Sequence, residues 1–341
     1  MRTKELINLS GSGYSGSTAL RDLLLEFEHI HHFNPNKVKY PEYYFISDPG
    51  GLLDLYGQLD NNWSHLRSTY FLRKNRVLFN KLSAANMKFI NPYGMNLKEF
   101  CVENPILIYN DFINQITLFS YQLDSRINRI DLTYFQLLFQ KIIRTVKITD
   151  RVLNPDKNNF LNAIKRFHSR IFHSQNQKGY LLIEKAIPLS NIESGSLMFD
   201  SIYNLICLRH PGDTYVEMTE RKTGIFKGSK HFDQNTLSNF LQWQENIIRP
   251  IYELSQNTNS INTKFLVVTF ENLIQDYHRT VDRIREFFQN KLGQHRKYQT
   301  HFKPSLSKQN IEIFQNVLDA KEISVIENSE VYKMYKHFQE Q

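Results

Sequence analysis

The chain has 341 residues, 41% of them hydrophobic, and a formal net charge of +8. This length and composition allow a substantial buried core and exclude a disordered chain as the default. The 42 Lys and Arg residues are scattered rather than gathered in runs, so the positive charge favours small anionic ligands over nucleic acid. Two cysteines, Cys101 and Cys207, exclude a disulfide framework and imply a reducing compartment.

The start of the chain bears on its location in the cell. Met1 to Lys4 leads directly into the first predicted strand rather than into a signal sequence. No continuous apolar segment approaches the roughly 20 residues that a membrane-spanning helix needs. We therefore expect a cytoplasmic protein without a transmembrane segment. Peripheral contact with a membrane and the oligomeric state stay open.

The first predicted elements are a strand near residues 5–9, a turn rich in Gly and Ser, and a helix with an apolar face. This order is typical of a phosphate-binding loop, whose N–H groups point at an anion. Gly11, Gly16 and Thr18 fit the pattern G-x-x-x-x-G-K-[ST], but Ser17 replaces its lysine. That lysine neutralises a γ-phosphate. A ligand with one phosphate-like group at the loop therefore fits better than ATP.

Residues 60–175 are predicted to form a mainly helical insertion, since apolar residues recur there at helical spacing. They include Trp63, the run from Leu132 to Ile148 and the run from Phe160 to Phe172. Further strands are expected near 180–184, 203–208 and 264–270. We expect most aromatic residues to pack in the core, Trp243 among them, and a terminal helix after residue 321.

The strand near 203–208 ends in Arg209-His210-Pro211-Gly212-Asp213. An arginine at the carboxyl end of such a strand, before a Pro-Gly turn and a helix, projects into the crevice where open α/β sheets hold ligands. Arg209 is therefore expected to face a ligand in that crevice.

The order strand, R-x-P-x-D, helix resembles the 3′-phosphate motif of sulfotransferases that use 3′-phosphoadenosine-5′-phosphosulfate (PAPS). Residues 14–18, Tyr-Ser-Gly-Ser-Thr, are similar to that family's 5′-phosphosulfate loop, [KR]-S-G-T-[ST]. Three further segments resemble family elements. They are Glu184-Lys185-Ala186-Ile187-Pro188 (E-K-T-P), the strand at 265–270 with Glu271-Asn272-Leu273 (Y-E-D-L), and Phe302 to Ser307 (F-x-P-x-x-S). Together they span residue 5 to about 310.

The resemblance implies an α/β fold of the P-loop type, with three layers, a central mainly parallel sheet and a large helical insertion. Residues 1–341 would form a single sulfotransferase-like domain, in which the insertion at 60–175 shapes the acceptor pocket. The residues implied in donor binding are Gly13, Tyr14, Ser15, Gly16, Ser17, Thr18, Arg209, Glu217 and Lys303.

Three of these positions depart from the family pattern. Tyr14 stands where the family usually has Lys or Arg, and Gly212 replaces a frequent basic residue. Glu217 stands where a serine usually meets the 3′-phosphate, and a carboxylate there would repel that group. Lys185 and Lys303 are among the cations that would compensate.

The implied reaction is the transfer of a sulfuryl group from PAPS to a hydroxyl or amine of a carbohydrate, glycolipid or similar acceptor. A base must take the acceptor's proton, and Glu42 is the first candidate, with His31 and His32 as alternatives. Lys185 is the candidate cation for the leaving phosphate. No metal ion is required. Two alternatives remain, a sulfotransferase-like binding protein with a decayed donor site and a P-loop kinase.

Overall fold

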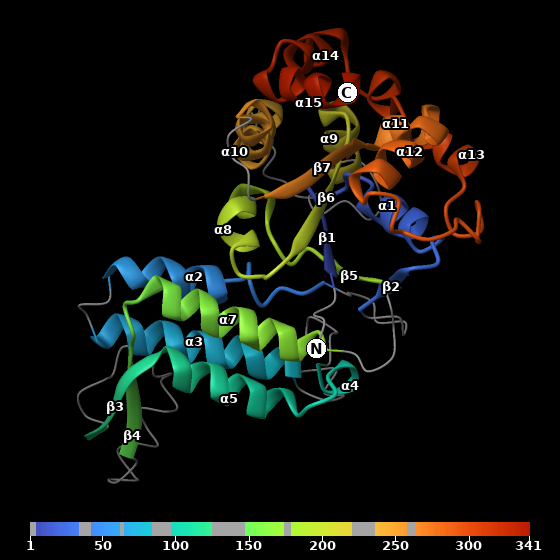
Figure 1. Ribbon diagram of the computed structural model, residues 1–341. Coiled ribbons are helices and arrows are strands. Elements are labelled where there is room, and N and C mark those ends of the chain that lie inside the picture. The colour runs from blue at the N-terminus through green and yellow to red at the C-terminus, as the bar shows by residue number, and fades with distance from the viewer. Residues whose placement is uncertain are drawn as a thin grey trace. The chain divides into compact units, whose positions relative to one another are not determined.

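The computed structural model describes residues 5–33, 42–61, 65–83, 97–124, 147–173, 179–219, 236–257 and 263–341. The chain divides into two compact units (Figure 1). The first comprises chiefly residues 36–176 with 197–200, and the second comprises 2–35, 177–196 and 201–341.

The second unit is built on a five-stranded parallel sheet in the order β2-β5-β1-β6-β7. The strands are β1 (Glu5–Gly11), β2 (Ile30–His32), β5 (Tyr180–Glu184), β6 (Ile202–Leu208) and β7 (Lys264–Thr269). β5 and β6 are buried along their whole length, as a parallel sheet covered on both faces requires. Because β1 lies between β5 and β6, the carboxyl ends of these three strands meet at one edge.

Helices cover both faces of this sheet (Figure 1). Along β6, Leu205 and Cys207 pack on one face with α1 (Ser17–Leu24), α11 (Phe270–Gln275) and α12 (Tyr277–Phe287). Ile206 and Leu208 pack on the other face with α9 (Pro211–Thr219), α10 (Thr236–Gln256), α14 (Ala320–Glu327) and α15 (Glu330–Glu340). The short helices α8 (Ile192–Ser196) and α13 (Pro304–Ser307) complete the unit.

The helices after β1 and β6 thus lie on opposite faces, which makes the β1–β6 edge a topological switch point, the usual ligand site of open α/β sheets. The predicted α/β class, with three layers and a central parallel sheet, is confirmed. Four predicted strands are found within two residues of their expected bounds. β2 has three residues, two of them histidine, and was not predicted from the sequence.

The first unit is mainly helical. Its α-helices, within the described residues, are α2 (Leu52–Gln58), α3 (His65–Ser83), α4 (Leu97–Phe100), α5 (Pro105–Ile116) and α7 (Lys157–Ile171). Figure 1 shows α2, α3, α5 and α7 side by side, with an antiparallel pair of strands at one end. This pair, β3 (Thr117–Asp124) and β4 (Lys147–Leu153), is absent from the sequence analysis. Trp63 and most of the run from Leu132 to Ile148 lie outside the described residues.

Aromatic side chains form the core of the first unit. Phe79 stacks on Tyr109 with ring centroids 4.2 Å apart, and Phe45 and Phe167 each pack edge-on against Phe79. The expected core role of the aromatic residues is therefore confirmed for this cluster. Trp243 of α10 is an exception, because 43% of it is exposed. Within the described residues, no helix combines the length and apolarity needed to cross a membrane.

His168 of α7 makes the stability of the first unit depend on pH. Its ring is buried, stacks on Phe199 with centroids 4.3 Å apart, and its Nδ1 lies 3.0 Å from the carbonyl oxygen of Met198. Burial lowers the pKa of His168 to about 4. The unfolded chain then binds more protons than the folded one between pH 4 and 6.5, so stability falls as the pH drops through this window.

We expect His168→Phe to flatten that pH profile. Between pH 7 and pH 5, this one histidine accounts for a loss of about 2 kcal/mol in the free energy of unfolding, and the variant lacks that contribution. Urea unfolding at several pH values, followed by circular dichroism, measures the difference. Equal losses in wild type and variant would show that His168 does not titrate in this way.

Candidate functional site

The loop between β1 and α1 has the backbone of a phosphate-binding turn. Tyr14 and Gly16 both adopt left-handed conformations, with φ of 61° and 85°. Gly16 is required here for a second reason: a Cβ atom on it would lie 2.3 Å from the ring of Phe270. α1 begins immediately afterwards at Ser17, without an acidic residue in its first turn. The first N–H groups of a helix have no partner within it, so they point an unopposed partial positive charge at this edge of the sheet.

Arg209 lies beside this loop. Its side chain is only 4% exposed, and its Nη1 donates to the carbonyl oxygen of Tyr14 at 3.3 Å. The same nitrogen lies 3.1 Å from a carboxylate oxygen of Glu217, and Nη2 donates to the carbonyl oxygen of Asn310. The guanidinium also lies over the ring of Phe270, 5.0 Å from its centroid. The strand-end arginine and the glycine-rich loop are therefore in direct contact at one edge of the sheet.

Asp213, the last residue of the R-x-P-x-D motif, has a structural role. It is fully buried, and its carboxylate accepts hydrogen bonds from the backbone N–H groups of Glu312 and Phe314 at 2.8 and 3.1 Å. Burial raises the pKa of Asp213, although those N–H groups and Arg209 act in the opposite direction. The carboxylate thereby holds the segment around residue 312 against the start of α9.

The structure gives a packing reason for Gly212. A Cβ atom there would lie 2.8 Å from the ring of Phe314 and 3.1 Å from Nδ1 of His210. The ring of His210 stacks on Phe314 with centroids 4.3 Å apart, and its Nδ1 accepts from the N–H of Gly212 at 3.1 Å. A basic side chain at position 212 is therefore incompatible with this packing.

Glu271 supports the same turn from the carboxyl end of β7. Its Oε1 accepts the backbone N–H of His210 at 2.9 Å. Burial raises the pKa of Glu271, and the hydrogen bond from His210 opposes that shift. The carboxylate thus fixes the residue that follows Arg209.

A cavity of about 650 Å³ opens at this edge of the second unit. Its volume is in the range of pockets that bind cofactor-sized molecules. The cavity is lined by residues of four described segments. These are the β1–α1 loop and α1 (Tyr14, Gly16, Thr18, Ala19, Asp22), the segment after β6 with α9 (Arg209, Glu217), α11 (Phe270), and residues 300–310 (Thr300, His301, Phe302, Lys303, Leu306, Ser307, Asn310).

A single buried carboxylate, that of Glu26, holds the late wall of this cavity. It accepts hydrogen bonds from the backbone N–H groups of Gln299, His301 and Phe302 at 2.9 to 3.0 Å. Its other contact is Nε2 of His295 at 2.6 Å. Because these N–H groups immediately precede Lys303, Glu26 sets where that lysine meets the cavity.

The implied donor-binding residues divide into two groups. Tyr14, Gly16, Thr18, Arg209, Glu217 and Lys303 line the cavity. Ser15 is instead buried and turns inward. A Cβ atom on Gly11 would lie only 2.2 Å from the hydroxyl oxygen of Ser15. Gly13 is exposed and Ser17 is half-buried, and neither lines the cavity.

Lys185 lies directly after β5, at the same edge of the sheet as the loop. Its N–H donates to the carbonyl oxygen of Leu9 at 2.9 Å, and its φ of 51° is left-handed. The preceding Glu184 lies 2.8 Å from Nε2 of His32 and 3.5 Å from a guanidinium nitrogen of Arg21. Burial alone would raise the pKa of Glu184, but His32 and Arg21 lower it below its ordinary value. His32 therefore pairs with Glu184. Lys185 is not among the residues that line the cavity beside Arg209.

Glu42 belongs to the first unit and is buried. Its role as a base stays a prediction. Phe270 and Asn310 are cavity residues that the sequence analysis did not single out for the site. Phe270 follows the predicted strand 264–270, but its approach to Gly16 is a tertiary contact that no local pattern indicates.

Comparison with solved structures finds sulfotransferase domains. The chain is similar to the sulfotransferase domain of the Synechococcus PCC 7002 olefin synthase, with 12% identity over 99% of this chain and 95% of that one, and a TM-score of 0.45. It is also similar to sulfotransferase STF9 from Mycobacterium avium, with 13% identity over 99% of this chain and 77% of that one, and a TM-score of 0.43. A sulfotransferase domain from the curacin biosynthetic pathway gives 13% identity, coverage of 96% and 97%, and a TM-score of 0.39. No family model and no curated protein matches the chain.

Proposed function

We propose that the protein is a sulfotransferase that moves a sulfuryl group from PAPS to a hydroxyl or amine of a carbohydrate, glycolipid or similar acceptor. The observation that carries this proposal is the hydrogen bond of 3.3 Å between the Arg209 guanidinium and the Tyr14 carbonyl oxygen. It brings a left-handed Gly/Ser loop and a strand-end cation to one cavity, as a ligand with an anionic group at each end requires.

The cavity suits a bisphosphorylated adenosine in other respects. The 5′-phosphosulfate end would lie on the N–H groups at the start of α1, and Lys303 would supply a cation. Phe270 and Phe302 offer apolar surface for the base. In this proposal Arg209 faces the 3′-phosphate.

The transfer is an in-line displacement at sulfur. The acceptor oxygen forms a bond to sulfur while the bond from sulfur to the bridging oxygen of the leaving phosphate breaks. Glu42 takes the proton that the acceptor hydroxyl loses, and Lys185 offsets the charge that develops on the leaving oxygen. The acceptor group would be selected by residues of the insertion at 60–175.

The Arg209–Glu217 pair favours a second candidate function. A carboxylate oxygen of Glu217 already pairs with Nη1 of Arg209 at 3.1 Å. A 3′-phosphate must therefore compete with this carboxylate for the guanidinium. A sulfotransferase-like binding protein with a decayed donor site would contain this arrangement too.

Calorimetric titration with 3′-phosphoadenosine-5′-phosphate separates these functions. Micromolar binding supports the proposed enzyme. If this ligand does not bind but ATP with magnesium does, a P-loop kinase is favoured. If neither binds, the binding protein with a decayed donor site is favoured. Adenosine 5′-monophosphate, which lacks the 3′-phosphate, is the matched control ligand.

We expect Glu217→Ser to tighten the binding of 3′-phosphoadenosine-5′-phosphate by about 10- to 100-fold. The substitution removes a competing negative charge from Arg209 and adds a hydroxyl donor, which together are worth about 1.4 to 2.8 kcal/mol. Titration of wild type, Glu217→Ser and the size-matched Glu217→Gln measures the effect. An equal gain for adenosine 5′-monophosphate would locate the effect away from the 3′-phosphate.

A further inference from the structure

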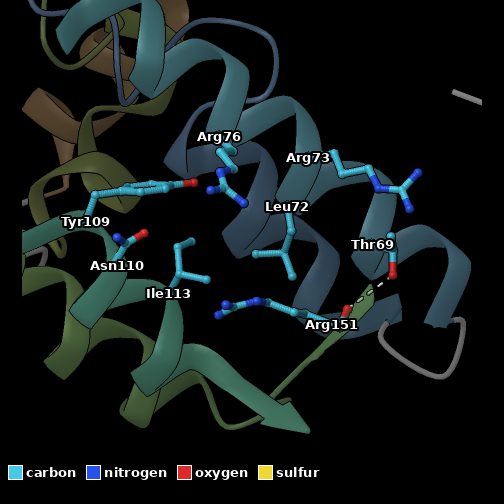
Figure 2. A pocket seen from close by; sticks show the side chains of 8 residues that line it. All are labelled: Thr69, Leu72, Arg73, Arg76, Tyr109, Asn110, Ile113 and Arg151. Atoms are coloured by element: carbon cyan, nitrogen blue, oxygen red, sulfur yellow. Dashed lines mark hydrogen bonds between the residues drawn. The ribbon is translucent and has the colours of Figure 1, made fainter. Parts of the chain in front are cut away.

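The first unit contains a second polar cavity, of about 90 Å³, between α3, α5 and β4 (Figure 2). Its floor is apolar, since Leu72 of α3 and Ile113 of α5 are both buried. Arg76 of α3 and Arg151 of β4 reach toward this floor from two sides, as Figure 2 shows. Arg73 also lines the cavity, but its guanidinium points away from the other two.

The charges at this cavity are unbalanced. Among the residues that the structure describes, none that lines it is acidic. Arg151 donates to the side-chain oxygen of Asn114 at 2.8 Å, a neutral partner. No ion pair or hydrogen bond joins Arg76 to the described part of the chain. Two cations that face one small space repel each other, and an anion between them removes that cost.

The neighbouring polar groups of the cavity are held in place. Tyr109 is buried and donates its hydroxyl to Asn75 at 3.0 Å, and Asn75 donates in turn to the carbonyl oxygen of Gly50 at 2.9 Å. Thr69 donates to the backbone carbonyl oxygen of Arg151 at 3.2 Å, which fixes the strand that carries this arginine to α3. The site is therefore built before any ligand arrives.

We propose that this cavity binds the acidic head of a small organic anion, with a sulfate, phosphate or carboxylate group between Arg76 and Arg151. Guanidinium groups match such oxyanions in geometry and charge. The cavity has the volume of about three liquid water molecules, so it holds the head alone. The head then lies over the apolar floor of Leu72 and Ile113, and the rest of the ligand extends out of the cavity.

This site consists of residues of the first unit only. It does not depend on the proposed sulfuryl transfer, because none of its residues lines the cavity beside Arg209. The anion is thus a ligand in its own right.

The test is calorimetric titration of the full chain with phenyl sulfate, phenyl phosphate and phenylacetate, and with benzyl alcohol as the neutral probe. We expect saturable binding of at least one anion and none of the alcohol. Arg76→Gln and Arg151→Gln should each weaken that binding by about 10- to 100-fold, the usual effect of losing a charge-assisted hydrogen bond.

Arg73→Gln is the matched control, since it removes the same charge from the same helix and should change the affinity by less than about twofold. Arg76 is exposed, so Arg76→Gln should keep the melting temperature of the wild type. The proposal is overturned if no anion binds, if binding survives both Arg76→Gln and Arg151→Gln, or if Arg73→Gln weakens it as much as Arg76→Gln. The relative affinities of the three anions identify the preferred head.

Discussion

Arg209→Ala is expected to abolish detectable binding of 3′-phosphoadenosine-5′-phosphate and to lower the free energy of unfolding by about 3 to 5 kcal/mol, the usual cost of breaking a buried ion pair. The stability loss follows because Glu217 keeps a nearly buried charge without its cation, and the carbonyl oxygens of Tyr14 and Asn310 lose a donor. Titration calorimetry and urea unfolding measure the two effects.

A paired substitution separates binding from folding. Arg209→Met combined with Glu217→Leu removes both charges and fills their space with apolar atoms, which is often neutral for stability. We expect this double variant to regain most of the lost stability and still not bind the nucleotide. A double variant that binds like the wild type would remove Arg209 from the ligand site.

Glu42→Gln is expected to reduce the turnover of sulfuryl transfer by about 10²-fold or more, which is the usual effect of a positioned general base. The amide keeps the size and polarity of the buried side chain but takes up no proton. The affinity for 3′-phosphoadenosine-5′-phosphate should stay the same, since Glu42 is not among the residues that line the cavity beside Arg209.

Turnover is measured with labelled PAPS and the acceptor found in a panel of sugars and glycolipids. Glu193→Gln is the matched control, because Glu193 is an exposed carboxylate in the second unit. Unchanged turnover in Glu42→Gln would exclude Glu42 as the base. A parallel loss of nucleotide affinity would instead assign it to donor binding.

The sheet was predictable because its strands are short, mainly apolar runs between turn signals. β6 is the clearest example, since all its residues from Ile202 to Leu208 are buried. β3 gave no such signal: Leu118 and Phe119 are more than half exposed, so its apolar residues do not mark a buried face. In β2 the two histidines concealed the strand, and pairing with β5 determines its structure.

The site was predictable only where chain order places its residues at strand ends. The loop at Gly16 and the arginine at 209 follow β1 and β6, which are neighbours in the sheet. Asn310 and Glu26 could not be found in this way. The first contributes a carbonyl oxygen to Arg209, and the second acts through backbone N–H groups about 270 residues further on. Such contacts depend on the tertiary fold and not on side-chain type.

The contact between Gly212 and Phe314 links two positions in the evolution of this chain. A lysine introduced at 212 alone would collide with the ring, because even a Cβ atom would lie 2.8 Å from it. A smaller residue at 314 must therefore come first, or at the same time. Any lineage or laboratory selection that introduces a cation at position 212 should acquire its substitutions in that order.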